Sequence, residues 1–241
     1  MIVLFTDFGV EGPYIGQMKA VLAREAPSEV VIDLFANAPS FDAQSAAYLL
    51  AAYSAEFPAG TVFLAVVDPG VGSERRAAAV LADGRWFVGP DNGLFNVVAM
   101  RARDVQWWDV TWRPERLSTS FHGRDVFAPV AARLARGASP PGQRMEPKLR
   151  TRRGWPDDLA RVIYIDCYGN AMTGLRATKL LADNQLEING HRLRRERTFS
   201  AAPIGHGFWY ENANGLAEIA VNQGRANQVL GIALGTPVNV I

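Results

Sequence analysis

The chain has 241 residues, and 49% of them are hydrophobic, so it can bury the core of one large domain or of two smaller ones. Its 25 Lys and Arg residues against 24 Asp and Glu residues leave a formal charge of +1, which provides no long-range field to attract nucleic acid or an anionic membrane. Cys167 is its single cysteine, which excludes an intrachain disulfide and a zinc or iron–sulfur centre built on thiolates of this chain alone.

The first part of the chain alternates strand-like and helix-like segments. Short apolar runs typical of buried strands occupy residues 2–5, 30–35 and 61–67. Pro13 suits the start of a helix between the first two runs, and Ser40 or Asp42 can cap a second helix that ends near Pro58. The order strand, helix, strand, helix, strand predicts right-handed crossovers, and hence a parallel core with helices on both faces.

The segment after the third strand bears on the kind of ligand. Residues 77–88 are predicted as two short strands that turn at Asp83-Gly84, so the glycine-rich loop before them does not open a helix. A dinucleotide fingerprint needs such a helix to hold the pyrophosphate, and a Rossmann site is therefore set aside. Further on, residues 90–95 predict a turn before a short helix, and residues 121–137 predict a helix that Gly137 ends.

The composition changes after residue 140. Residues 141–160 are rich in proline and basic residues without an apolar period, which predicts a linker. Residues 161–241 alternate strand-like segments with Gly and Asn turns, and Asn189-Gly190 is a hairpin signal. The sequence thus predicts an α/β N-terminal domain, residues 1–140, with a mainly parallel sheet flanked by helices, and a smaller mostly-β, barrel-like C-terminal domain over residues 161–241.

Several sequence motifs follow one another along nearly the whole chain. They are TDFG (6–9), GPYIGQMKA (12–20), VVDPGVGSERR (66–76), GPDNGLF (89–95), FHGRDVFAP (121–129) and IDCYGN (165–170). With these motifs in this order the chain resembles the SAM hydroxide adenosyltransferase family, also called S-adenosylmethionine (SAM) hydrolases, which is similar to the fluorinases and chlorinases. The resemblance implies a homotrimer in which each SAM lies between the N-terminal domain of one subunit and the C-terminal domain of its neighbour.

The resemblance also implies that Asp68, Arg75 and His122 are catalytic. The sulfonium of SAM leaves as a neutral thioether, so attack at C5′ of the ribose needs neither a metal nor a redox cofactor. It does need an activated nucleophile, because bulk water has a pKa of about 15.7. His122 can accept the proton, directly or through Asp68, whereas Arg75 stays protonated and can orient the carboxylate and stabilise developing hydroxide charge. Which of Asp68 and His122 takes the proton is left open.

Two residues of the N-terminal domain match positions that hold the ribose in this family. Asp7 follows the first strand, and a carboxylate there can accept both hydroxyl protons of a cis-diol. Phe41 falls where relatives place an aromatic ring over the ribose and adenosyl region. The ordinary structural alternatives are a turn for Asp7 and a core contact before a helix for Phe41.

Four residues of the C-terminal domain are assigned to the rest of the substrate. Asn170 can offer the adenine edge both a donor and an acceptor, and Phe199 can stack on the ring. Asp166 can pair with the methionine ammonium, although an aspartate at a strand end also commonly caps a turn. Asn214 stands, after Ala213, where the halogenases have a Ser-Arg pair that grips the substrate carboxylate, so recognition of that carboxylate is left open.

Departures from the halogenases favour water as the nucleophile. Those relatives have tyrosines at the positions of Asp68 and His122, and a halide-binding serine at the position of Gly123. A carboxylate at position 68 repels an anionic nucleophile. The alternatives kept open are a SAM-dependent halogenase or another adenosyl transferase, and a non-catalytic module that binds SAM or adenosine.

The predicted activity is therefore hydrolysis of SAM to adenosine and methionine, without a metal or another cofactor. The N-terminus shows no basic signal-peptide region, and no stretch reaches the roughly 18 apolar residues of a membrane span. Together with the single cysteine, this predicts a cytoplasmic protein with no nucleic acid or membrane partner.

Overall fold

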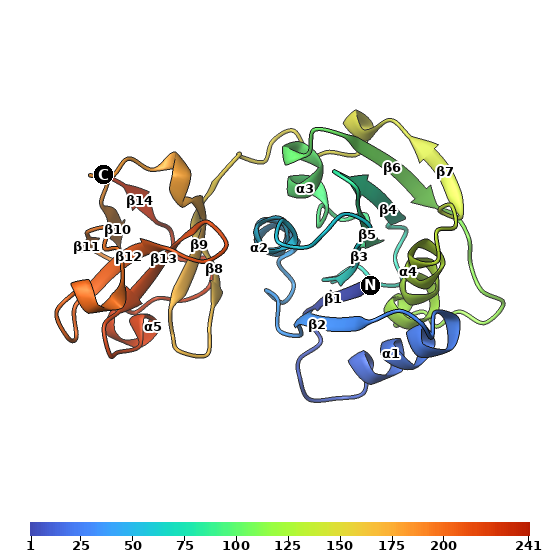
Figure 1. Ribbon diagram of the computed structural model, residues 1–241, viewed down its shortest axis with the longest axis horizontal. Coiled ribbons are helices and arrows are strands. Elements are labelled where there is room, and N and C mark those ends of the chain that lie inside the picture. Colours follow the sequence, from blue (N-terminus) through green and yellow to red (C-terminus); the bar gives the residue numbers. More distant parts are fainter. The chain divides into compact units, whose positions relative to one another are not determined.

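The computed structural model describes residues 1–241, which form two compact units, Met1–Trp155 and Pro156–Ile241 (Figure 1). The first unit contains a seven-stranded sheet with helices on both faces, and the second is built mainly from antiparallel strands. No helix combines the length and the apolar character that a membrane span requires.

One half of the large sheet is parallel, as the sequence predicts. Its strands are β1 (Ile2–Thr6), β2 (Val31–Phe35), β3 (Val62–Val66) and β5 (Arg85–Pro90). They lie in the order β2-β1-β3-β5, and every residue of β1 and β3 is buried. Strands covered by helices on both faces have no solvent side, which explains why these segments are continuous apolar runs.

The other half of the sheet is antiparallel, so the sheet is mixed. Its further strands are β4 (Ala77–Ala82), β6 (Val105–Val110) and β7 (Gly142–Met145), in the order β5-β4-β6-β7. The predicted turn between β4 and β5 is confirmed, and both of its residues have positive φ, 45° for Asp83 and 78° for Gly84. The Asp83 carboxylate also accepts the N–H groups of Arg103 and Asp104, which fixes the start of β6.

Strand β7 corrects one expectation. Its four residues lie in the segment predicted as a linker, yet they pair with β6 at the edge of the large sheet. Three of the four are exposed, so the strand has no apolar alternation that a sequence pattern could reveal. Backbone pairing with a neighbouring edge, and not burial of side chains, forms this strand.

The helices cover the two faces of the sheet. They are α1 (Tyr14–Glu25), α2 (Ala43–Ser54), α3 (Asn96–Arg101) and α4 (Ala128–Ala135). Helix α1 packs against α4 on one face, and α2 packs against α3 on the other (Figure 1). The predicted cap of α2 is confirmed, because Asp42 accepts the N–H of Ser45 at 3.0 Å. Gly137, with φ of 80°, follows the end of α4 as predicted.

The segment predicted as one helix from residue 121 begins differently. Residues Gly123–Phe127 form a π-helix that continues into α4. Pro129 has no N–H to donate to the carbonyl of residue 125, so the turn before it lacks a regular α-helical bond. Single π-helical turns of this kind are frequent at functional sites, and this one starts directly after His122.

The second unit confirms the mostly-β expectation. Its elements are β8 (Leu159–Ile165), β9 (Ala171–Arg176), β10 (Leu186–Ile188), β11 (His191–Leu193), β12 (Gly207–Glu211), β13 (Leu216–Val221), α5 (Ala226–Val229) and β14 (Asn239–Val240). One sheet has the order β12-β13-β9-β8 and the other β11-β10-β14. Single bridges, Arg161 to Pro237 and Arg195 to Trp209, join the two sheets at both ends and give a barrel-like ring of strands around the buried Trp209.

Short 3-10 helices, Pro147–Leu149, Ala177–Lys179 and Phe199–Ala201, complete the chain. The predicted hairpin at Asn189-Gly190 joins β10 to β11, with φ of 49° and 80° at its two turn residues.

Candidate active site

The loop after β3 begins the candidate site. Asp68 comes two residues after the end of this buried parallel strand, where open α/β sheets place their ligands. Asn92 donates its side-chain amide to the carbonyl of Val67 at 2.8 Å and so fixes the backbone just before Asp68. Within the loop, the Ser73 hydroxyl donates to the carbonyl of Gly70 at 2.6 Å and accepts the N–H of Arg75 at 3.3 Å. These bonds turn Arg75 back toward Asp68.

A glycine in this loop is required by a close approach. Gly72 has φ of 81°, and a Cβ atom there would lie 2.5 Å from the carbonyl oxygen of Thr119. The loop that carries Asp68 and Arg75 therefore lies against the segment that leads to His122. Backbone contact sets the spacing between the two halves of the site.

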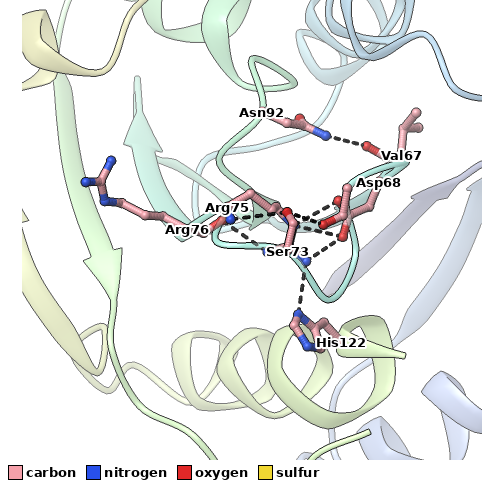
Figure 2. Close-up of polar contacts among 8 residues, drawn as sticks. Val67, Asp68, Ser73, Arg75, Arg76, Asn92 and His122 are labelled. Carbon is pink, nitrogen blue, oxygen red and sulfur yellow. Dashed lines mark hydrogen bonds and ion pairs between the residues drawn. The ribbon is translucent and has the colours of Figure 1, made fainter. Parts of the chain in front are cut away.

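Arg75 contacts both of the other predicted catalytic residues, Asp68 and His122. Its Nε lies 2.8 Å and 3.0 Å from the two carboxylate oxygens of Asp68, its Nη2 also contacts Oδ2, and the two side chains are only 10% and 5% exposed. The same Nη2 lies 3.1 Å from Nδ1 of His122. Figure 2 shows Arg75 between Asp68 and His122, whereas Arg76 points away. The guanidinium also lies 5.1 Å from the ring centroid of Phe127, which supports it from the side of the π-helix.

The contact with Arg75 sets the protonation state of His122. A guanidinium can only donate, so Nδ1 of His122 must accept, and the neutral ring then carries its proton on Nε2. Burial and the charge of Arg75 lower the pKa of His122, while the charge of Asp68 opposes the shift. His122 is therefore neutral at pH 7 and contacts the same Nη2 of Arg75 that also contacts Asp68.

A small cavity of about 160 Å³ opens beside this ion pair. Its lining consists of Phe8, Tyr14, Val66, Asp68, Val71, Ser120, Phe121 and Gly123. The rings of Phe8, Tyr14 and Phe121 pack against one another with centroids 5.3–5.9 Å apart. Asp68 is the only charged residue in the lining, so a small polar molecule held there meets one carboxylate in otherwise mostly apolar surroundings.

The predicted ribose residues lie close to each other and to this cavity. The N–H of Phe41 donates to Oδ2 of Asp7 at 3.4 Å. Burial raises the pKa of Asp7, and the negative charge of Asp68 raises it further, so the two carboxylates repel each other. Phe41 has φ of 60° and is 80% exposed. A phenylalanine in the left-handed region is strained, and such strain is concentrated at ligand sites.

A larger cavity of about 770 Å³ lies in the C-terminal unit. Three of the four binding residues predicted there, Asp166, Asn170 and Phe199, line it. Asp166 accepts the N–H groups of Tyr168 and Asn170 at 2.9 Å and 2.8 Å, and the side-chain amide of Asn170 at 3.0 Å. The alternative role of Asp166 as a turn cap is thus present in the structure alongside its place in the cavity wall.

Asn214 is placed differently from the other predicted binding residues. It lies in the turn between β12 and β13, outside the set of residues that line the cavity, and its N–H donates to the side-chain oxygen of Asn212 at 3.0 Å. Its proposed contact with the substrate carboxylate stays a prediction.

The structure adds residues that sequence reasoning did not assign. In the small cavity these are Phe8, Tyr14, Ser120 and Phe121, and in the larger one Tyr168, Tyr210 and Arg225. Phe8, Tyr14 and Phe121 lie inside the quoted motifs, next to residues that were assigned, so the signal was available. Tyr210 lies in a strand with no such motif, and only the fold places it in the cavity wall.

Comparisons with known proteins identify the family of the chain. Residues 2–143 match the family model of the SAM hydroxide adenosyltransferase N-terminal domain, and residues 160–239 match that of the C-terminal domain. The chain is 39% identical to a protein of Thermus thermophilus named (R)-S-adenosyl-L-methionine hydrolase, over 100% of this chain and 99% of that protein.

A solved structure and a more distant relative complete the picture. The crystal structure of an uncharacterized conserved protein from Thermotoga maritima superposes with a TM-score of 0.90 at 30% identity, over 100% of both chains. A fluorinase of Nocardia brasiliensis is 23% identical over 57% of this chain and 54% of its own length. The likeness to the hydrolase is thus both closer and longer than the likeness to this fluorinase.

Proposed function

The chain belongs to the SAM hydroxide adenosyltransferase family, and from this premise we propose that it hydrolyses SAM at C5′ of the ribose to give adenosine and L-methionine. The name of the full-length relatives specifies (R)-S-adenosyl-L-methionine, so the proposed substrate is the (R) epimer at sulfur. The observation that carries the proposal is the contact of Asp68, Arg75 and His122 beside a cavity large enough for a water molecule.

The reaction is a displacement in which the oxygen of water bonds to C5′ as the C5′–S bond breaks. The electron pair of that bond stays on sulfur, which becomes the neutral thioether of methionine. The attacking water must then lose one proton to complete the hydroxyl of adenosine. The protein's task is to hold the water in line with the C5′–S bond and to receive this proton.

Asp68 is the proposed first acceptor of the proton. Its carboxylate lines the small cavity, whereas His122 does not. In addition, Nδ1 of His122 accepts from Arg75, which leaves an N–H at Nε2 and no free lone pair on the ring. A water in the cavity therefore meets the carboxylate and not the imidazole, and His122 can take up the proton only after its contact with Arg75 loosens.

Arg75 and His122 act on the carboxylate. Arg75 holds both oxygens of Asp68 in place beside a mostly apolar cavity. His122 accepts from Nη2 of Arg75, the nitrogen that also contacts Asp68, at 3.1 Å, and its neutral form avoids a second positive charge there. The three groups thus position the acceptor before the substrate binds.

Substrate recognition is proposed to use residues of both units. Asp7 and Phe41 hold the ribose, Asn170 and Phe199 the adenine, and Asp166 the methionine ammonium. The protein is also proposed to form a homotrimer, in which each SAM lies between the N-terminal domain of one subunit and the C-terminal domain of its neighbour. The reaction is also proposed to take place in the cytoplasm, a reducing compartment in which an exposed free thiol such as that of Cys167 persists.

The halogenase alternative meets an electrostatic obstacle. Fluoride or chloride in the small cavity would lie beside the Asp68 carboxylate, in surroundings that screen charge less well than water. The binding-module alternative leaves the buried, hydrogen-bonded set of Asp68, Arg75 and His122 without a purpose.

The test is release of adenosine from resolved epimers of SAM, followed by chromatography in the presence and absence of chloride. The proposal expects adenosine from (R)-SAM, a much slower reaction of (S)-SAM, and no 5′-chloro-5′-deoxyadenosine. Binding of SAM without turnover would favour the module, and a chlorinated product would favour the halogenase.

A further inference from the structure

A buried carboxylate in the C-terminal unit has no place in the mechanism above. Glu218 lies in the middle of β13 and is only 3% exposed. Its two oxygens have separate partners: the hydroxyl of Tyr210 donates to Oε1 at 2.6 Å, and the side-chain amide of Asn212 donates to Oε2 at 2.9 Å. No basic side chain pairs with it.

Burial of the Glu218 carboxylate without a cationic partner is unfavourable for the stability of the folded protein. Burial raises the pKa of Glu218 and the charge of Asp166 adds to this, while the hydrogen bonds from Tyr210 and Asn212 oppose the shift. A carboxylate in such a position does not serve stability well, since an apolar side chain of similar size commonly packs as favourably. Its value has to lie in what its two donors do.

The first donor belongs to the wall of the larger cavity. Tyr210 lines the cavity, and its ring lies edge-on to Phe199, with centroids 5.2 Å apart. Phe199 is the predicted stacking partner of adenine. By fixing the hydroxyl of Tyr210 at the back of the wall, Glu218 fixes the ring against which Phe199 rests.

The second donor controls the turn between β12 and β13. Asn212 is 8% exposed, and its side-chain oxygen accepts the N–H groups of Asn214 and Leu216, both at 3.0 Å. Because its amide nitrogen donates to Glu218, the side chain cannot turn over and lose these two acceptor bonds. Glu218 thus also determines the shape of the turn that carries Asn214.

We propose that Glu218 is a positioning residue for the substrate, which sets Tyr210 and Phe199 in the cavity wall and, through Asn212, the turn of Asn214. The inference rests on the proposed function, because it assigns this cavity to SAM. Glu218 acts through other residues and lies in a different unit from Asp68, so it governs the binding of SAM and leaves the chemical step unchanged.

The first experiment compares Glu218→Leu with Glu218→Gln. Leucine keeps the volume and removes both acceptors, whereas glutamine keeps one acceptor for Asn212 and offers an amide to the Tyr210 oxygen. Glu218→Leu should raise KM for SAM roughly tenfold with kcat within about twofold, and Glu218→Gln should recover most of the loss. Glu211→Leu is the matched control on the neighbouring strand, where the exposed Glu211 pairs with Arg195, and KM should not change.

A double-mutant cycle with Tyr210→Phe separates positioning from general stability. If one bond carries the effect, Tyr210→Phe raises KM by itself, and adding it to Glu218→Leu raises KM little more. Unchanged KM in Glu218→Leu and in Tyr210→Phe, or a cycle in which the two effects simply multiply, overturns the inference. A fall of kcat equal to the rise of KM, with no recovery in Glu218→Gln, also overturns it.

The wild-type reaction keeps this failure distinct from failure of the proposed function. If the wild-type protein releases adenosine from SAM while the variants keep its KM, only the role of Glu218 is wrong. If the wild-type protein releases no adenosine, the proposed function is wrong and the inference falls with it.

Discussion

Each unit of the protein buries a carboxylate beside a cavity, but the two carboxylates have different partners. The side chain of Asp68 is 5% exposed and bound by the guanidinium of Arg75, whereas Glu218 is 3% exposed and bound by the neutral groups of Tyr210 and Asn212. Charged hydrogen bonds from Arg75 hold both oxygens of Asp68, whereas neutral donors fix the position of Glu218. Under the proposed function, Asp68 takes part in the chemical step, whereas Glu218 shapes the wall of the larger cavity.

The largest expected effect comes from removing the charge of Asp68. Asp68→Asn keeps the shape but cannot accept the proton, so kcat should fall by at least about a thousandfold with little change in SAM affinity. Single-turnover kinetics and calorimetric titration of SAM check the two quantities. Asp33→Asn, an exposed carboxylate paired with Lys19, is the matched control. A loss of SAM affinity as large as the loss of turnover would show that Asp68 acts in binding. It would contradict the different roles given to Asp68 and Glu218.

Replacement of His122 should have the next largest effect. His122→Ala frees one side of Arg75, and kcat should fall by roughly a hundredfold while KM stays nearly constant. Steady-state kinetics at several SAM concentrations measures both. An effect confined to KM would contradict a role at the ion pair.

The pH dependence tests the state of His122 in the wild-type protein. Because its pKa is lowered in the folded state, the ring is neutral down to below its ordinary value of about 6.5. Its contribution to kcat should therefore be constant from about pH 8 to 6.5 and fall only in more acidic solution. The linked stability follows the same sign: the unfolded chain binds the proton first, so the free energy of unfolding falls as the pH drops below about 6.5. An acid limb above pH 7 that disappears in His122→Ala would contradict the neutral ring.

The smallest effect is expected from Asn170. Asn170→Ala removes an amide that donates to Asp166 and faces the proposed adenine site, so SAM binding should weaken by about tenfold with kcat nearly unchanged. Calorimetry with SAM and with adenosine measures the loss, and Asn184→Ala in the same unit, away from the cavity, serves as the control. A variant that binds normally but turns over slowly would place part of the chemistry in the C-terminal unit.

The fold can be predicted where buried strands and tight turns require a recognisable pattern of residues. Strands β1 and β3 are continuous apolar runs because both faces are covered, and the turns at Asp83-Gly84 and Asn189-Gly190 need the left-handed residues that they have. Strand β7 cannot be predicted from the sequence, because three of its four residues are exposed and only backbone pairing with β6 forms it.

The candidate site follows the same division. The motifs predict Asp68, Arg75 and His122 as site residues, and the structure brings the three into contact. Glu218 was not, although a lone glutamate inside the apolar strand LAEIAV is a visible signal of a buried charge. Its meaning depends on Tyr210 and Asn212, which reach it only through the pairing of β12 with β13.

The most direct test of the central claim is the reaction run in ¹⁸O-labelled water with mass analysis of the products. Attack by a water held at Asp68 predicts one label in the 5′ oxygen of adenosine and none in methionine. Adenosine incubated with the enzyme in the same water controls for later exchange. Unlabelled adenosine, or methylthioadenosine with label in a homoserine product, would show that solvent does not attack C5′ and would contradict the account.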